Sequence, residues 1–154
     1  MKKKSVYVIM HNIRSCYNIG SLFRTSDALG IEKVFLGGYS PRPDQNKSIS
    51  KTALGAEKCV EWEAHWHTHA IIDKLKADGV RIVALEQAEK SIDLNQYQPI
   101  FPMAILVGNE VKGLSRSILS RVHDIVEIPM KGEKESLNVS VAFGIAAYTL
   151  IMEE

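Results

Sequence analysis

Three separated segments of this chain place small and polar residues among apolar runs that ought to be buried. The segments span residues 18–25, 108–114 and 128–140. Glycine lets a backbone approach a ligand closely, and a buried polar side chain is costly unless a partner satisfies it. We therefore expect the three segments to meet in one composite pocket, and we expect the function of the protein to lie there.

In the first segment, Asn18 has the side chain of a helix N-cap residue, and Arg24 follows about a turn and a half further along. One interpretation is that Asn18 organises a loop while Arg24 presents its planar set of donors to a phosphate. The alternative is that Asn18 is an ordinary cap and that Arg24 pairs with a carboxylate such as Asp27. This segment taken alone favours the alternative.

In the second segment, Gly108 and Gly113 flank Glu110 directly after an apolar run, residues 103–107, that is predicted to be a buried strand. Ligands of open α/β sheets bind beyond the carboxyl ends of the strands, so this loop is expected to form a pocket wall. Its spacing matches neither the dinucleotide-binding glycine motif nor a P-loop, and nucleotide binding by those two mechanisms is not indicated. Glu110 is then either a binding residue or a surface residue of a tight turn.

In the third segment, Ser136 and Asn138 precede an apolar helix, where free N–H groups can meet a cap or an anion. Two capping side chains so close together exceed the needs of one helix N-terminus. One of them could therefore face a ligand.

His65, His67 and His69 alternate with other residues, and alternate residues of a strand share one face. However, no cysteine or pair of acidic residues supports a metal site there, and the sequence that follows has a helical pattern. We therefore expect no metal. No Ser/His/Asp set and no catalytic pair of carboxylates can be named from the sequence.

Apolar runs of strand length alternate with helical patterns along the chain, which indicates an α/β fold with a mostly parallel sheet flanked by helices. Strands are predicted at residues 6–10, 33–36, 60–62, 81–85, 103–107 and 125–128. Helices are predicted at residues 20–29, 67–77, 115–121 and 138–152. The last helix is apolar around nearly its whole circumference, so it must be buried on more than one side. We expect a second subunit to cover one of those sides in a homodimer.

The length of 154 residues predicts a single domain that spans residues 1–154. No apolar run approaches the roughly 20 residues of a membrane helix, and the basic start lacks the other features of a signal peptide. The two cysteines form neither a disulfide framework nor a metal-type spacing, and we expect a cytoplasmic protein.

The net charge of +1 conceals an uneven distribution. Residues 1–58 carry ten Lys or Arg against four Asp or Glu, whereas the rest of the chain carries nine against fourteen. A basic N-terminal third fits a polyanionic partner that docks there. The alternative is that residues 2–4, all lysine, form a solvated tail that inflates the count.

Taken together and in order, these segments resemble the three motifs of the SPOUT superfamily, and in particular its TrmH/SpoU branch of RNA ribose 2′-O-methyltransferases. The first motif resembles residues 12–15 (NIRS) and 18–25 (NIGSLFRT), and the second resembles residues 106–110 (LVGNE) and 113–115 (GLS). The third motif resembles residues 128–130 (IPM), Gly132 and residues 136–140 (SLNVS). Residues 50–57 (SKTALGAE) are also similar to the family.

The resemblance implies a C-terminal deep trefoil knot in the sheet, a feature that is otherwise essentially absent from proteins. It further implies that S-adenosylmethionine lies bent in the knot and that two subunits pack to complete the active site. The implied partner is RNA, either tRNA or rRNA. The catalytic domain is expected to act without a separate RNA-binding domain.

By the same resemblance, Asn18 and Arg24 match the catalytic Asn and Arg of the family, and Glu110, Ser136 and Asn138 match its supporting catalytic positions. The positions implied around the cofactor are Leu85, Val107, Gly108, Glu110, Gly113, Ile128, Met130, Ser136, Leu137 and Asn138. The implied reaction is attack of a ribose 2′-hydroxyl on the sulfonium methyl group, with proximity and in-line orientation supplying much of the acceleration.

Two roles for Arg24 remain open. The family proposal makes it a base that is assisted by the phosphate of the RNA, although a guanidinium group is a poor base at neutral pH. The alternative is that Arg24 stays charged, fixes the phosphate and stabilises the developing alkoxide. Competing functions are a SPOUT methyltransferase that acts on an RNA base, a non-catalytic RNA-binding protein of the same fold, and a general α/β ligand-binding domain.

Overall fold

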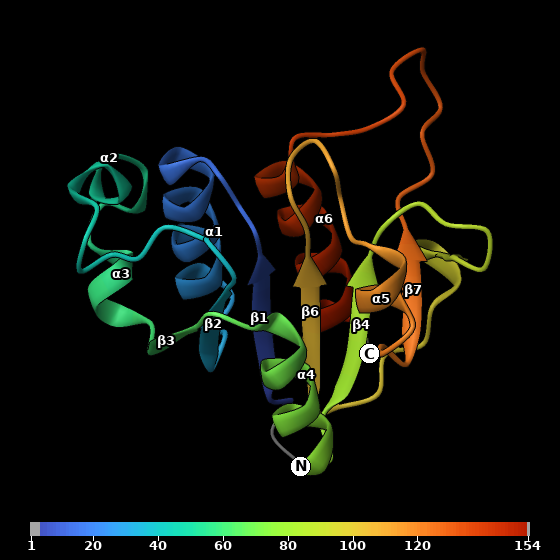
Figure 1. The fold of residues 1–154 in the computed structure, drawn as a ribbon. Helices are drawn as coiled ribbons and strands as arrows, with labels where there is room; N and C mark the ends of the chain where they lie inside the picture. The colour runs from blue at the N-terminus through green and yellow to red at the C-terminus, as the bar shows by residue number, and fades with distance from the viewer. Residues whose placement is uncertain (1–3, 154) are drawn as a thin grey trace.

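The computed structural model describes residues 4–153 and is built on one parallel β-sheet (Figure 1). Lys2 and Lys3, which belong to the basic N-terminal third, lie outside the described residues. Within residues 4–153 the sheet has seven strands in the order β3-β2-β1-β6-β4-β7-β5, and every neighbouring pair is parallel. The strands are β1 (Val6–His11), β2 (Lys33–Gly37), β3 (Trp62–His65), β4 (Arg81–Leu85), β5 (Ile92–Asp93), β6 (Met103–Val107) and β7 (Asp124–Glu127). The predicted α/β fold with a parallel sheet is confirmed.

The connections between the strands carry the helices. They are α1 (Cys16–Ala28), α2 (Ser50–Ala53), α3 (Ala56–Cys59), α4 (Thr68–Ala77), α5 (Arg116–Leu119) and α6 (Val139–Met152), with short 3₁₀ turns η1 (Lys47–Ile49) and η2 (Leu94–Gln96). In the part of the chain that the structure describes, no helix has the length and apolar content needed to span a membrane.

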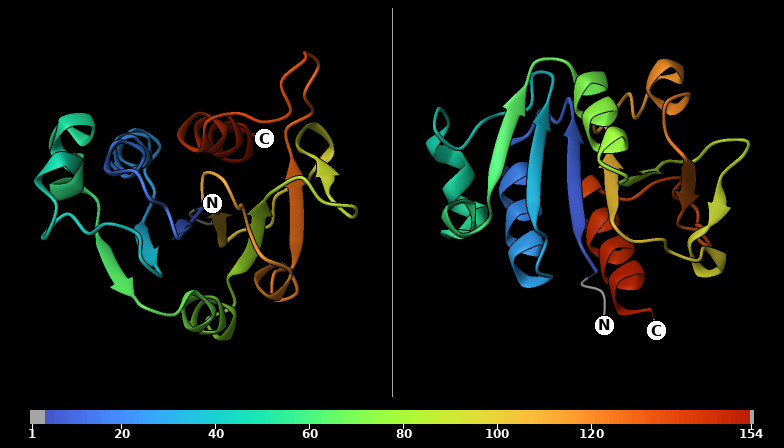
Figure 2. Two further views of the ribbon diagram at one scale, coloured as in Figure 1. Left: turned by 45° about the horizontal axis from the view of Figure 1, so that its top comes forward. Right: turned by 90° about the horizontal axis from the view of Figure 1, so that it is seen from below.

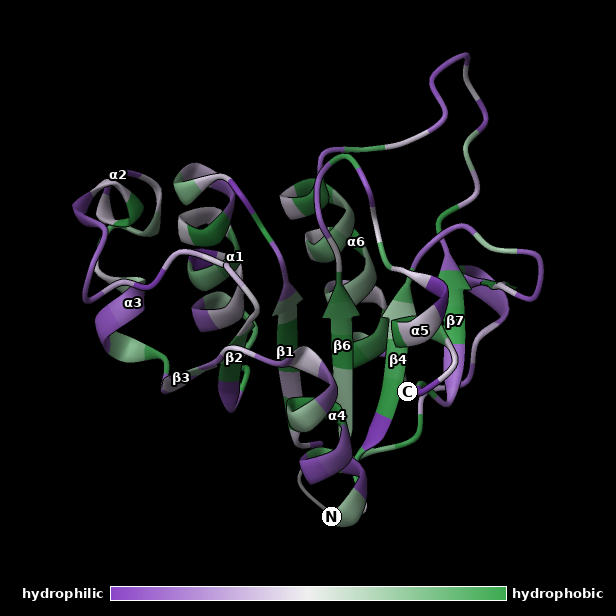
Figure 3. Cartoon of the chain, in the orientation of Figure 1, coloured by the Kyte–Doolittle hydropathy of each residue, from purple (hydrophilic) through white to green (hydrophobic). Residues whose placement is uncertain are grey.

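The two faces of the sheet are both covered: α1 and α6 lie on one face, and α4 and α5 lie on the other (Figure 2). Successive residues of β1 therefore serve opposite layers of the core. Met10 belongs to the cluster of Phe23 and Phe143, whereas its neighbour Ile9 belongs to the cluster of Ile71. Because neither face meets water, the central strand β6 is buried and apolar along its whole length (Figure 3).

Five of the predicted strands are confirmed to within one residue at each end, as β1, β2, β4, β6 and β7. The strand predicted at residues 60–62 is wrong. Val60 is the C-cap residue of α3, with its N–H donating to the carbonyl of Ala56 at 3.0 Å, and the strand begins only at Trp62. Five short elements, α2, α3, β5, η1 and η2, were not predicted because they are too short to show a hydrophobic period.

The predicted last helix is confirmed as α6, and the predicted helices at residues 67–77 and 115–121 are confirmed as α4 and the shorter α5. Helix α1 begins earlier than predicted, at Cys16, and its N-cap residue is Ser15. The Oγ atom of Ser15 accepts a hydrogen bond from the N–H of Asn18 at 3.2 Å. The prediction that Asn18 caps this helix is therefore wrong, because Ser15 already fills that role. The side chain of Asn18 is left free to make other contacts.

Gly20 lies inside α1, where glycine normally weakens a helix. Its place is explained by the close approach of the neighbouring segment. A Cβ atom at this position would collide with the Oγ1 atom of Thr52 and with the main chain of Ile49 and Ala53. The hydroxyl of Thr52 donates to the carbonyl of Tyr17 at 2.8 Å, which ties α2 to the first turn of α1.

We expect the substitution Gly20→Ala to lower the free energy of unfolding by about 1–3 kcal/mol, the usual cost of overpacking. The higher helix propensity of alanine will not compensate, because the colliding atoms include main chain. Urea denaturation followed by circular dichroism measures the change. Gly132→Ala is the control, since a Cβ atom there would meet nothing within 4 Å. An equal loss in both variants would contradict the packing argument.

Candidate active site

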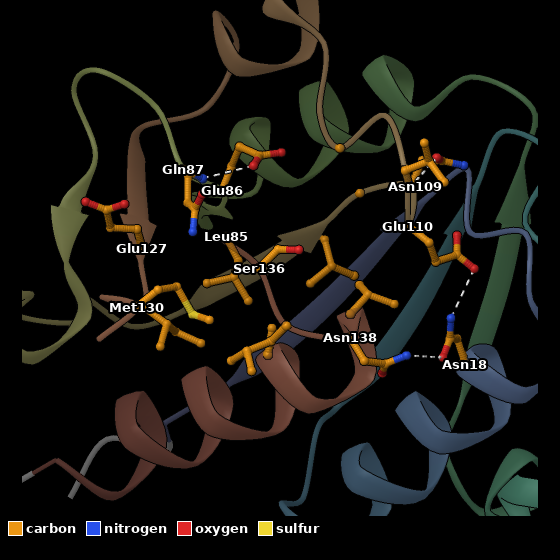
Figure 4. A pocket seen from close by; sticks show the side chains of 18 residues that line it. Asn18, Leu85, Glu86, Gln87, Asn109, Glu110, Glu127, Met130, Ser136 and Asn138 are labelled. Carbon is orange, nitrogen blue, oxygen red and sulfur yellow. Dashed lines mark hydrogen bonds between the residues drawn. The ribbon is translucent and has the colours of Figure 1, made fainter. Parts of the chain in front are cut away.

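A cavity of about 470 Å³ opens at the carboxyl ends of β4 and β6 (Figure 4). Its walls come from the residues that follow β4, β6 and β7 and from the start of α6. All three motif segments contribute to it, so the composite pocket expected from the sequence is confirmed. The predicted residues that line the cavity are Asn18, Leu85, Val107, Gly108, Glu110, Gly113, Ile128, Met130, Ser136, Leu137 and Asn138.

Three polar side chains, one from each motif segment, form a hydrogen-bonded series along one side of the cavity (Figure 4). The Nδ2 atom of Asn138 donates to the Oδ1 atom of Asn18 at 3.1 Å. The Nδ2 atom of Asn18 then donates to the Oε2 atom of Glu110 at 3.1 Å. Each of the two amides thus has its orientation fixed by a neighbour.

The carboxylate of Glu110 also accepts two main-chain N–H groups of the loop between β1 and α1. Arg14 N lies 2.9 Å from Oε1, and Ser15 N lies 2.8 Å from Oε2. Burial of this carboxyl raises its pKa, but the hydrogen bonds from Arg14, Ser15 and Asn18 favour the charged form, and the net effect is a lowered pKa. Glu110 is therefore a carboxylate at the edge of the cavity at neutral pH. It is a structural anchor as well as a cavity residue.

The two capping candidates before α6 have different positions. Asn138 is the N-cap residue, and its Oδ1 atom accepts hydrogen bonds from the N–H groups of Ser140 at 2.9 Å and Val141 at 3.3 Å. Ser136 lines the cavity, and its hydroxyl has no hydrogen bond to any residue within 4–153. Of the two, Ser136 is therefore the residue whose hydroxyl is not used in capping, and its role toward a ligand stays a prediction.

The loop after β6 is held in a tight conformation that only glycine permits at two points. A Cβ atom at Gly108 would collide with the main chain of Gly113, and Gly113 itself has a positive φ of 63°. The N–H of Gly113 donates to the carbonyl of Asn109 at 2.9 Å, which closes the loop. A carboxylate oxygen of Glu86 accepts the N–H of Leu114 at 2.9 Å, which joins this loop to the end of β4.

Several lining residues were not predicted. They are Glu86, Gln87, Asn109, Val111, Glu127, Val139 and Ala142. A signal for the first two was available, because Glu86 and Gln87 are polar residues that directly follow a buried strand, as Asn109 and Glu110 do. Ligands bind beyond the carboxyl ends of parallel strands, so the end of β4 is expected to contribute lining residues as the end of β6 does.

Arg24 is the one predicted site residue that the structure does not place in the cavity. It is exposed on α1, and within residues 4–153 it makes no ion pair, so the predicted alternative of a pair with Asp27 is not observed. Arg24 lies six positions after Asn18, which puts the two side chains on different sides of the helix, about 9 Å apart along its axis.

The histidines are not arranged as one set. His65 ends β3, whereas His67 is the N-cap residue of α4 and His69 lies within that helix. In the described part of the chain, no three His, Cys, Asp or Glu side chains gather in a way that could hold a metal ion.

Comparison with known proteins identifies the family. Residues 5–148 match the SpoU rRNA Methylase family. The chain belongs to this family. The match extends over all three motif segments and the whole sheet, and so over every segment that lines the cavity.

Among its relatives, a tRNA (guanosine(18)-2′-O)-methyltransferase of Borreliella burgdorferi is 32% identical over 94% of this chain and 65% of its own length. A solved structure of an AdoMet-bound rRNA methyltransferase from Sinorhizobium meliloti has 27% identity and a TM-score of 0.89, covering 97% of this chain and 56% of that one. A third match is a solved structure that concerns the 2-OH methylation of C/U34 on tRNA. It has 26% identity and a TM-score of 0.83, and the match covers 94% of this chain and 93% of that one. The chain thus spans less than two thirds of the first two relatives and nearly all of the third.

We expect the substitution Glu110→Gln to lower the free energy of unfolding at pH 7 by about 1–3 kcal/mol, because a charged acceptor of three N–H groups is replaced by a neutral one. The pKa of Glu110 is lowered in the folded protein, so its contribution is present above the ordinary value of 4.5 and is lost as the pH falls through the folded-state value. The difference between wild type and variant should therefore shrink below about pH 4.5.

Urea unfolding at several pH values measures this difference. Glu89→Gln is the matched control, since Glu89 is exposed and makes no hydrogen bond or ion pair in the described chain. If the difference in unfolding free energy between wild type and Glu110→Gln does not change with pH, the carboxylate charge is not the stabilising feature.

Proposed function

We propose that this protein transfers a methyl group from S-adenosylmethionine to a ribose 2′-hydroxyl of tRNA or rRNA. The observation that carries the proposal is the series Asn138–Asn18–Glu110 at the edge of the cavity, because it unites the three SpoU motif segments in one oriented polar array. Membership of the SpoU rRNA Methylase family supports the same reaction class. The names of the relatives, which include tRNA and rRNA methyltransferases, support RNA as the substrate.

The cavity fits the proposed cofactor in size and in the chemistry of its walls. Its volume of about 470 Å³ is typical of a site for a small molecule, and its apolar walls suit an adenine ring. Within the described chain, residues 129–137 make no hydrogen bond between main-chain groups, and the carbonyl of Glu135 accepts only the side chain of Gln87 at 2.7 Å. The other C=O groups of this segment, and the N–H groups after Pro129, are available to a ligand. These are the groups that a nucleoside and an amino-acid moiety need. The AdoMet-bound relative from Sinorhizobium meliloti has the same fold.

When bound, S-adenosylmethionine would supply a methyl group that is already activated by the positive sulfur. The residues of this chain then have to bind the cofactor and the RNA, orient them toward each other, and exclude water from the site. Leu85, Ile128 and Met130 give the cavity its apolar lining, and Ser136 offers a hydroxyl without a protein partner. Asn18 and Asn138, each oriented by a neighbour, hold the polar side of the cavity where the ribose would enter. When a group is transferred between two bound molecules, such fixed alignment supplies much of the rate acceleration.

A homodimer is part of the proposal. Four apolar side chains at helical spacing on α6 are between 42% and 58% exposed: Val141, Ile145, Tyr148 and Met152. They form one stripe along a helix whose other side packs on α1 and β6, and a second subunit is the expected cover. In such a dimer, the exposed Arg24 of one subunit would complete the cavity of the other. Its guanidinium would bind an RNA phosphate near the reacting hydroxyl.

The trefoil knot is also part of the proposal, and two features support it. Strand β7 lies between β4 and β5, so the chain returns into the sheet after β6 is complete. The chain then passes through residues 128–138 and reaches α6, which contacts α1, β6 and η2. Family membership supports the same path. The knot would hold the loop after β6 and the loop after β7 next to each other, where both line the cavity.

A methyl-transfer assay tests the function. The purified protein is incubated with S-adenosylmethionine and unmodified tRNA or rRNA, and the RNA is digested and analysed for methylated nucleosides by mass spectrometry. We expect 2′-O-methylated nucleosides, mapped to one position, with residues 18 and 34 of tRNA as the first positions to inspect. A methylated base would instead support the base-modifying alternative. Binding of S-adenosylhomocysteine without any transfer would support a non-catalytic RNA-binding protein.

We expect the substitution Asn138→Asp to lower the methyl-transfer rate by about 100-fold, the scale of a small misplacement of a reacting group. The aspartate keeps an oxygen that accepts the N–H groups of the α6 N-terminus, but it loses the Nδ2 donor to Asn18. Circular dichroism should show an unchanged fold. A variant with the wild-type rate would remove the hydrogen-bonded series from the mechanism.

Subunit mixing tests whether Arg24 acts across the dimer. Chains carrying Arg24→Ala and chains carrying Asn138→Asp are expected to be inactive as homodimers. In a heterodimer of the two, one site would combine an intact Asn138 with Arg24 of the other chain, and we expect about half of the wild-type activity from that site. Two affinity tags allow the heterodimer to be purified. An inactive heterodimer would show that Arg24 and Asn138 must come from the same chain.

A further inference from the structure

A second hollow of about 400 Å³ adjoins the cofactor cavity, on the other side of the loop after β6. Its lining residues are Arg14, Tyr39, Asn109, Val111 and Lys112. Asn109 and Val111 line both spaces, so the hollow and the cavity share a wall. Neither the predicted site residues nor the hydrogen-bonded series accounts for this hollow. It combines one aromatic ring with two cationic side chains.

The aromatic ring is held in place from several directions. The hydroxyl of Tyr39 accepts a hydrogen bond from the Nδ2 atom of Asn109 at 3.0 Å, and the N–H of Tyr39 donates to the Oδ1 atom of Asn12 at 3.2 Å. Asn12 and Gly38 both have a positive φ, and a Cβ atom at Gly38 would collide with the Asn12 side chain. Ser40 closes the turn by donating to the carbonyl of Met10 at 3.0 Å. Tyr39 nevertheless remains 49% exposed, so one part of its ring is fixed and another faces solvent.

The two cations are fixed at their main chain and unpaired at their side chains. Arg14 N donates to Glu110, and Lys112 N donates to the Oδ1 atom of Asn109 at 2.8 Å. Within residues 4–153, neither the guanidinium of Arg14 nor the ammonium of Lys112 makes an ion pair or a hydrogen bond. The acidic residue nearest to Lys112 in the sequence, Glu110, already has three N–H partners for its carboxylate. The hollow therefore presents positive charge that no group of the described residues neutralises.

A fixed, half-exposed aromatic ring beside two unpaired cations matches the two parts of a nucleotide. Bases stack on aromatic side chains whatever their sequence, and phosphates bind Arg and Lys. The proposed cofactor does not match, because S-adenosylmethionine has no phosphate and carries a positive sulfur.

We propose that this hollow is a subsite for the RNA nucleotide that flanks the methylated one, with its base against Tyr39 and its phosphate against Arg14 and Lys112. The inference rests on the proposed function, since it assigns a place to the next nucleotide of the same substrate. Asn109 is a positioning residue for both spaces. Its Nδ2 atom also donates to the carbonyl of Asn12 at 2.8 Å, and its main chain closes the loop that forms the cofactor wall. The subsite would bind RNA without reading its sequence, and it would draw the neighbouring ribose into the cavity.

The test uses a fluorescently labelled single-stranded RNA of mixed sequence and measures its binding by anisotropy at several salt concentrations. We expect Tyr39→Ala to weaken binding by at least about fivefold, the lower end of the effect of losing one base stack. Tyr39→Phe keeps the ring and loses only the hydroxyl, and it should stay within about twofold of wild type. If Tyr39→Phe binds as weakly as Tyr39→Ala, the ring acts through Asn109 and not by stacking, and the proposal is overturned.

The double substitution Arg14→Ala and Lys112→Ala should weaken binding and reduce the slope of log affinity against log salt by about 0.7, the value for one phosphate on a single strand. The matched control is Lys90→Ala with Arg116→Ala, which removes one exposed lysine and one exposed arginine that make no ion pair in the described chain. An equal change in slope for both double variants would overturn the subsite, because any two cations would then suffice.

Calorimetric titration with S-adenosylhomocysteine separates this proposal from the proposed function. Tyr39→Ala and the Arg14/Lys112 variant should bind S-adenosylhomocysteine as the wild type does, and in the methyl-transfer assay their KM for RNA should rise more than their kcat falls. Wild-type protein that binds neither S-adenosylhomocysteine nor RNA would refute the proposed function. Wild-type protein that methylates RNA, together with variants whose RNA affinity and KM are unchanged, would refute the subsite alone.

Discussion

Glu110 accepts three N–H groups from the segment after β1, two from the main chain of Arg14 and Ser15 and one from the side chain of Asn18. A carboxylate that is partly removed from water needs such donors, and here they come from a different loop. The contact joins the loop after β6 to the start of α1, across the boundary between two adjacent strands. If it were absent, Asn18 would lose its orientation, Asn138 would lose its fixed partner, and both hollows would lose a common wall.

The position of this contact follows from the order of the strands. Strands β1 and β6 are neighbours, but the chain leaves them toward opposite ends of the sheet, from β1 to β2 on one side and from β6 past β4 to β7 on the other. Loops that diverge in this way leave a crevice at the carboxyl edge. Glycines at positions 108 and 113 allow the loop after β6 to fold tightly there, and Asn109 fixes it from within. The crevice thus becomes two spaces with one shared wall.

The two spaces have complementary chemistry. The cofactor cavity is lined by apolar side chains, by main-chain groups without main-chain partners, and by amides and carboxylates that include the series from Asn138 to Glu110. The adjoining hollow has an aromatic ring and two unpaired cations. A positively charged sulfonium suits the first and a polyanion suits the second, so the charge distribution by itself would sort the two substrates into their places. The apolar stripe of α6 is the surface on which the proposed second subunit would pack, and that subunit would bring its Arg24 to the cavity.

Much of this protein could be predicted from local patterns. The central strands are short apolar runs. A run such as residues 103–107 contains no polar side chain to face water, so burial on both faces follows from its composition alone. The three motif segments are also local, because the glycines and capping residues act within a few positions of the chain. Prediction failed where elements were too short to show a period, as at β5, and where two residues competed for one local role, as Ser15 and Asn18 did at the start of α1.

The sequence by itself determined the α/β class, the positions of the main strands, the cavity segments and the family, since each depends on residue type and spacing along the chain. Only the tertiary structure decided that Asn18 bonds to Glu110 and Asn138, residues 92 and 120 positions away. The tertiary structure also placed Arg24 outside the cavity of its own chain and brought Tyr39 beside Arg14 and Lys112. These outcomes depend on the strand order and on hydrogen-bond distances. No periodicity in a single chain encodes either one, because both arise when distant segments meet at one edge of the sheet.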